Sequence, residues 1–235
     1  MEPRIFTFIL VLIIMGTSKV AYCQNENFGI KIFAGVYSAN FSVPDNTYIN
    51  DTTFTYMSVP DDVDILIGAD FYYNFLERTG VYGEINFFLF NPTANIKMGQ
   101  TINTSNGPII VYDSWGTSYS FLRANITGGL SQRITEFVAI NGGIGLNFNI
   151  PTAEPFIGNN PGKFFEIANA LRPIYRKTNT MYQIGVSFNW RKISLNINYQ
   201  STFANETERF ILDNATYAHQ SRLGYWTISL GYEIR

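Results

Sequence analysis

Three residues near the end of the chain are of the types that nucleophilic catalysis uses. His219 is the only histidine, Ser221 follows it closely, and Asp213 lies upstream in the same polar segment. An imidazole can take a proton from a serine hydroxyl when a carboxylate orients the ring. The spacing does not fix that geometry, and a single histidine in a polar loop is usually solvated. We therefore expect a solvated His219 and no enzymatic activity.

The sequence argues against several other kinds of site. It contains no metal-ligand spacing, phosphate-binding loop or redox motif, and its formal net charge of -2 comes without a basic cluster. We therefore expect no cofactor, no metal and no nucleic acid partner.

The remaining candidates are charged side chains within strand-like stretches. The set is Lys31, Asp70, Glu84, Arg123, Glu233 and Arg235, three of each sign. Whether these side chains meet depends on the elements that hold them.

The last stretch of the chain, 223–235, shows what those elements are. Its large apolar residues fall on one face and its small polar residues on the other, with the period of two that a β-strand has. The same alternation recurs in seven earlier stretches, at 28–41, 65–75, 81–89, about 115–130, 138–150, 182–190 and 193–200. We expect the apolar faces to meet lipid and the glycine-rich polar faces to line a lumen, as in a transmembrane barrel.

The connections predict the topology. Three short turns alternate with four long polar segments near 42–64, 92–114, 151–178 and 204–221. The fold class is therefore all-β, an eight-stranded antiparallel up-and-down barrel with both termini in the periplasm. A ten-stranded barrel is the alternative, because 53–57 is also strand-like. Asn106-Gly107 predicts a hairpin turn, and the spacing of apolar residues in 163–171 predicts a short helix over the mouth.

Composition agrees with a barrel. Aromatic residues make up 16% of the chain and charged residues 14%, against roughly 25% charged in an average soluble chain. After the N-terminus no run approaches the ~18 apolar residues of a membrane helix. The girdles at the two membrane surfaces would come from Tyr72, Tyr73, Phe75, Tyr182, Trp190, Tyr199, Trp226 and Tyr232.

Residues 1–23 have the parts of a secretory signal peptide, with Arg4 before an apolar core and small residues before the cleavage position. Cleavage after Cys23 leaves 24–235 as the barrel domain, without cysteine. A short membrane anchor and a lipid-modified Cys23 are the alternatives.

The chain resembles the outer-membrane β-barrel domain family of Gram-negative bacteria, often labelled "porin family". The resemblance rests on 28–31, 35–41, 83–85, 119–126, the glycine-rich strand at 138–150, and 228–232. It implies a monomer in the outer membrane, in contact with outer-membrane lipids, that meets periplasmic chaperones and the barrel-assembly machinery during biogenesis. Arg235, after the final aromatic and apolar alternation, departs from the family pattern.

An eight-stranded barrel is just wide enough for side chains to fill it, so the inward charges are expected to neutralise one another. Lys31 and Glu233 are expected to be neighbours, because the first and last strands must pair. The leading hypothesis is a non-enzymatic barrel that stabilises the envelope or binds a ligand or partner through its outer loops. A narrow channel for ions or small solutes is the second hypothesis. The third is a lipid A-modifying enzyme, because small barrels of that kind use a histidine, a serine and a carboxylate.

Overall fold

The computed structural model describes residues 28–44, 46–59, 63–156 and 162–234. The predicted signal peptide and Arg235 lie outside these ranges.

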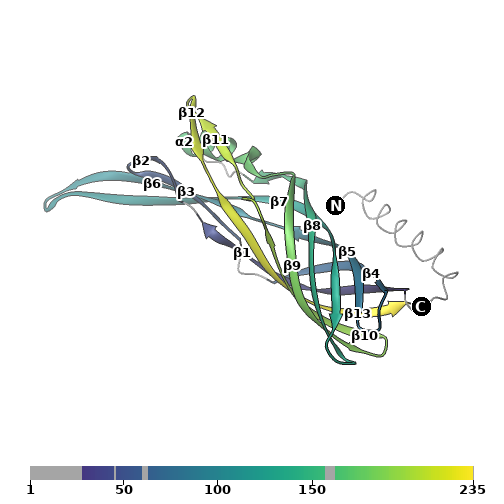
Figure 1. Ribbon diagram of the computed structural model, residues 1–235. Helices are drawn as coiled ribbons and strands as arrows, with labels where there is room; N and C mark the ends of the chain where they lie inside the picture. Colours follow the sequence, from purple (N-terminus) through teal and green to yellow (C-terminus); the bar gives the residue numbers. More distant parts are fainter. Residues whose placement is uncertain (1–27, 45, 60–62, 157–161, 235) are drawn as a thin grey trace.

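Eight antiparallel strands form a closed barrel (Figure 1). They are β1 (Phe28–Pro44), β4 (Asp64–Asn74), β5 (Thr79–Phe90), β7 (Gly107–Arg133), β8 (Val138–Phe156), β9 (Thr178–Trp190), β10 (Ile193–Thr202) and β13 (Ser221–Ile234). Each strand pairs with the next of the eight along the chain. The pairing of β1 with β13 closes the cylinder. The predicted eight-stranded barrel is confirmed.

The closing seam depends on a close approach of two backbones. Gly35 lies opposite Ser229, and a Cβ atom on Gly35 would stand 2.2 Å from the carbonyl oxygen of Ile228. Glycine is therefore required at this position for β1 and β13 to come together.

The outward face of the barrel carries exposed apolar side chains on every strand. Ile67 is 43% exposed and Ile144 is 68% exposed, although both lie within regular strands. The equivalent exposed residues on the other strands are Val36, Leu89, Ile126, Ile184, Ile193 and Leu230. A continuous apolar surface of this kind around a closed barrel is what lipid, rather than water, accommodates. None of the helices among the described residues is long and apolar enough to cross a membrane.

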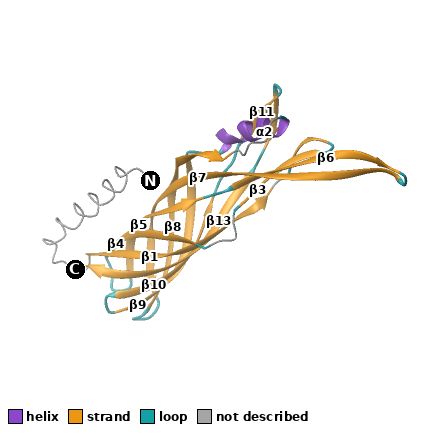
Figure 2. Ribbon diagram, turned by 180° about the vertical axis from the view of Figure 1, so that it is seen from behind, coloured by secondary structure: helices purple, strands orange, loops and turns teal. Residues whose placement is uncertain are grey.

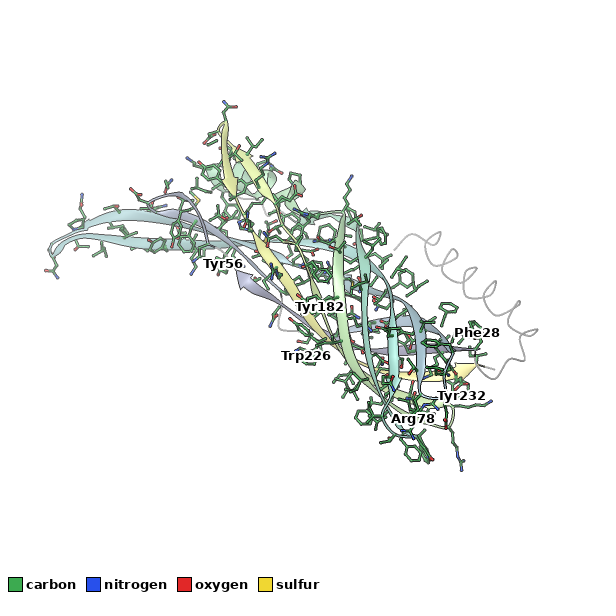
Figure 3. The ribbon with its side chains drawn as sticks, viewed as in Figure 1. Phe28, Tyr56, Arg78, Tyr182, Trp226 and Tyr232 are labelled. Atoms are coloured by element: carbon green, nitrogen blue, oxygen red, sulfur yellow. The ribbon has the colours of Figure 1, made fainter. Side chains whose placement is uncertain are left out.

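Aromatic side chains mark the two edges of this apolar belt. At one edge three rings pack side by side: the Tyr182 and Tyr199 centroids are 6.3 Å apart, and the Tyr199 and Trp226 centroids are 5.1 Å apart. At the other edge lies the exposed ring of Tyr232 (Figure 3). Trp190 is exposed at the same level, because Ile193 lies between it and Tyr232 in the strand pairing. The eight residue steps from Tyr182 to Trp190 along the tilted strand span roughly 20 Å along the barrel axis. Such a height suits the hydrocarbon core of a membrane.

Tyr72 does not belong to either girdle, and its expected place there is wrong. Its ring faces the interior, with its centre 5.1 Å from Lys31 Nζ. Residues two apart in a strand lie on the same face, and Asp70, two residues earlier on β4, also faces the interior.

A sheet extends beyond the barrel at the end opposite the short turns (Figures 1 and 2). β6 (Thr93–Thr104) pairs with the first part of β7 through the turn at Asn106-Gly107, which confirms the predicted hairpin. β3 (Thr53–Ser58) pairs with β6, and β2 (Thr47–Asn50) pairs with β3. The strand at 53–57 therefore exists but lies outside the barrel, so the ten-stranded alternative is wrong.

The rest of the end opposite the short turns, called the outer end below, is a cap over the barrel mouth. It consists of α2 (Lys163–Leu171), the short 3₁₀ helix η1 (Arg172–Ile174), and the hairpin of β11 (Arg209–Leu212) with β12 (Ala215–Ala218). The predicted helix is confirmed, and its buried residues are Phe164, Ile167, Ala168 and Leu171. Much of the long polar segments is thus regular structure rather than loop.

Candidate functional site in the barrel lumen

A layer of polar side chains crosses the middle of the lumen. Glu84 on β5 accepts hydrogen bonds from Asn86 Nδ2 (2.5 Å) and from Gln183 Nε2 on β9 (2.8 Å). Gln200 on β10 donates to Gln183 (2.8 Å), and Asn125 on β7 donates to Asn86 (2.8 Å). All five side chains are buried. The layer divides the interior into an outer half and a half that faces the short turns.

The outer half is closed by a buried ion pair. Arg123 on β7 donates to the Glu206 carboxylate at 2.7 Å, and both side chains are fully buried. Glu206 comes from the connection between β10 and β11, which enters the mouth of the barrel, and it also accepts hydrogen bonds from Asn149 (2.6 Å) and Asn179 (3.2 Å). Three strands therefore hold the carboxylate of one outer connection inside the lumen.

Aromatic side chains fill the space around this ion pair. The Arg123 guanidinium lies 4.8 Å from the centre of the Phe90 ring and 5.9 Å from that of Tyr225. Tyr175, beyond η1, packs against Tyr119 and Phe121 of β7. The same hydrophobic core continues to the buried face of α2. The cap and the outer half of the lumen are thus one packed unit.

The other half of the lumen contains a cavity of about 840 Å³ that opens between the short turns. Lys31, Asp70, Glu84 and Glu233 line it, together with residues of the three turns. The polar layer forms its blind end, because Glu84 and Gln183 belong to both.

The six charged candidates therefore do not form one network. Lys31, Asp70, Glu84 and Glu233 line the cavity, Arg123 lies on the other side of the polar layer, and Arg235 lies outside the described residues. Lys31 is directly opposite Glu233 in the seam, as expected, but its Nζ donates to Asn189 Oδ1 (2.7 Å). The expected neutralisation among the six is wrong for Arg123, whose partner is Glu206.

Sequence reasoning missed Glu206. It lies in a polar segment with no strand periodicity, two residues before another glutamate, and its partner precedes it by 83 residues. The one sequence signal was indirect: a strand that places an arginine in a narrow lumen requires a buried acidic partner.

His219 is buried, and the expectation that it is solvated is wrong. Its Nδ1 lies 2.8 Å from Thr47 Oγ1 and 3.3 Å from Thr55 Oγ1, so the ring joins the outer sheet to the start of β13. Asp213 is exposed at the tip of the β11–β12 hairpin, where it lies 4.0 Å from Lys163 Nζ. The hydrogen-bonding contacts of the imidazole are thus with threonines. The Ser221 hydroxyl is buried and has no hydrogen-bond partner among the described residues, so the structure does not assemble the three catalytic candidates.

The stability of the cap is expected to fall as the pH decreases from 6.5 to 4. Burial lowers the pKa of His219 from 6.5 to about 4. Between these values the unfolded chain binds a proton that the folded chain does not. Stability from the neutral ring is present above pH 6.5 and is lost as the pH falls to 4. Chemical unfolding at a series of pH values measures this slope. This slope is proportional to the number of protons that the chain takes up on unfolding, and in His219→Gln that number should be lower by close to one. An equal slope in the wild-type protein and the variant would contradict a buried, neutral His219.

No metal site is found among the residues that the structure describes, in the sense of three or more His, Cys, Asp or Glu side chains placed to hold an ion.

Comparisons with known proteins find similar solved structures at low sequence identity. No family model matches the sequence, and no curated protein matches it. Among solved structures, the outer membrane protein OprG of Pseudomonas aeruginosa has a TM-score of 0.48 at 13% identity, over 90% of this chain and 99% of that chain. Ail, the attachment invasion locus protein of Yersinia pestis, has a TM-score of 0.45 at 15% identity, over 88% and 98%. E. coli Outer Membrane Protein W has a TM-score of 0.39 at 17% identity, over 89% and 100%. The resemblance to the "porin family" stays a prediction.

Proposed function

We propose that this chain is a non-enzymatic integral protein of the bacterial outer membrane, closed to solutes, that acts through its outer end. In this arrangement both termini lie in the periplasm, and the extended sheet and the cap face the outside. The outer end either stabilises the envelope or binds an extracellular ligand or partner. The apolar belt supports the membrane location, because it surrounds the barrel between two aromatic edges.

The main support for a closed lumen is the buried ion pair of Arg123 with Glu206. Two buried charges held by Asn149 and Asn179 form a rigid obstruction, since breaking the pair leaves an uncompensated charge. The polar layer below and the aromatic packing above add two further barriers on the same axis. Ions entering from either side would have to displace all three.

The refolded protein is therefore expected to give no discrete current steps in a planar lipid bilayer. Heat-modifiable gel mobility checks in parallel that the barrel is folded. The matched control is Glu84→Gln, which neutralises the carboxylate of the polar layer and should be equally silent.

A narrow channel is the second candidate, because the cavity already penetrates half of the lumen. A channel would give current steps in the wild-type protein, with a cation preference that falls in Glu84→Gln. That result would contradict the closed barrel and would make the lumen the functional site.

A further inference from the structure

The cavity at the turn end of the barrel has the size of a ligand site. Its volume of about 840 Å³ lies within the roughly 300–1,000 Å³ of pockets that bind small molecules. It is open at the short turns and closed at the polar layer, so a solute can enter from one side only. The cavity lies at the end of the barrel opposite to the outer end, which the proposed function uses. A ligand bound here would therefore give the protein a second function.

The blind end of the cavity carries a formal excess of negative charge. Asp70 lies directly opposite Glu84 on one side and opposite Lys31 on the other, and Lys31 lies opposite Glu233. Lys31 is the one basic residue among these four, and its Nζ donates a hydrogen bond to Asn189. Among the ion pairs of the described chain, none includes Asp70 or Glu84. Two adjacent carboxylates in a low-dielectric site repel one another, and a bound cation or a proton relieves that repulsion.

Buried oxygen atoms around this end lack hydrogen-bond donors. Asp70 Oδ1, Asn198 Oδ1 and the Tyr82 hydroxyl are buried and have no partner among the described residues. The Asn198 side chain, from β10 across the cavity, is only 5% exposed. Buried polar atoms in proteins are nearly always hydrogen-bonded. An ammonium group, with three donors and a positive charge, supplies what these acceptors need.

The rim of the cavity has the opposite charge. Four basic and two acidic side chains line it, namely Arg78, Arg133, Arg191 and Lys192 with Glu77 and Glu136. Arginine and lysine at a rim suit a carboxylate or another small anionic group. From Asp70 to the end of β4 at Asn74 the tilted strand rises by about 10 Å along the barrel axis, which is enough depth for a dipeptide.

We propose that this cavity binds a small zwitterionic solute of about the length of a dipeptide. Its primary ammonium lies between Asp70 and Glu84, and its carboxylate lies among the basic residues of the rim. The charge order of the cavity, negative at the blind end and positive at the mouth, sets this orientation.

Calorimetric titration of the refolded protein in detergent micelles tests the proposal with three matched probes. Glycylglycine has both charges, glycylglycinamide has only the ammonium, and N-acetylglycylglycine has only the carboxylate. Glycylglycine should bind at least tenfold more tightly than N-acetylglycylglycine. Asp70→Asn and Glu84→Gln should each weaken glycylglycine binding by tenfold or more. Arg191→Gln should weaken binding of glycylglycine but not of glycylglycinamide.

Asp64→Asn is the matched control variant. Asp64 is on the same strand as Asp70 and faces the interior, but it contacts the Tyr37 hydroxyl (3.2 Å) at the far side of the polar layer. Binding should be unchanged in this variant. Equal affinities for the three probes, no heat from a folded barrel, or equal losses in Asp64→Asn and Asp70→Asn would overturn the proposal. Calcium chloride is titrated separately, and calcium binding that excludes glycylglycine would overturn it in favour of a metal site.

Discussion

Arg123→Ala is expected to lower the free energy of unfolding by about 3–5 kcal/mol, the usual cost of removing one partner of a buried ion pair. The variant leaves the Glu206 carboxylate fully buried, with only the amides of Asn149 and Asn179 as donors. It also removes the guanidinium that packs against the rings of Phe90 and Tyr225. Denaturant unfolding in micelles, followed by tryptophan fluorescence, measures the loss.

The double variant Arg123→Met with Glu206→Leu separates charge from packing. It removes both charges and keeps side chains of similar bulk, so it should recover most of the stability that Arg123→Ala loses. A loss below about 1 kcal/mol in Arg123→Ala would show that the pair behaves like a surface ion pair. The obstruction of the lumen would then be water-filled rather than sealed.

Ile184→Arg should lower the free energy of unfolding by about 1–3 kcal/mol, because Ile184 lies in the belt two residues from its aromatic edge at Tyr182, and the cost of an outward arginine falls from about 2–4 kcal/mol at the midplane to about 0–1 kcal/mol near the interfaces. Ile184 is 56% exposed on β9, between the aromatic edges at Tyr182 and Trp190. Its neighbour Gln183 points into the polar layer, so the substitution does not touch the lumen. The same unfolding assay in micelles and in lipid vesicles measures the cost.

Ile110→Arg provides the control for exposure alone. Ile110 is 50% exposed on the part of β7 that extends beyond the barrel. Surface substitutions in water usually change stability by less than about 0.5 kcal/mol, and that is the effect expected here. Equal costs at the two positions would refute the assignment of the outward face to lipid.

The barrel strands were predictable because each carries its own signal. A period of two repeated eight times is a local pattern, and it places Arg123 and Glu84 inside and Ile184 outside without knowledge of any partner. The helix at 163–171 was predictable for the same reason, from the spacing of its apolar residues. Short turns alternating with long connections then gave the order of the strands.

The contents of the lumen were only partly predictable, because they depend on contacts between distant segments. Strand periodicity shows that Lys31 and Arg123 point inward, but not that Lys31 donates to Asn189 or that Glu206 enters the mouth. His219 was misjudged for the same reason. Its burial comes from Thr47 and Thr55, on an outer sheet more than 160 residues earlier in the chain.

The seam between β1 and β13 has a consequence for the order of folding. Ile30 lies opposite Ile234, so the first strand of the described chain has to wait for nearly the whole sequence before its second edge is paired. Contacts of such long sequence separation form slowly, and an unpaired strand edge invites association with other chains in the meantime. An incompletely assembled chain is therefore open to association until its last strand pairs. The exposure of the β1 edge ends when β13 pairs with it and closes the barrel.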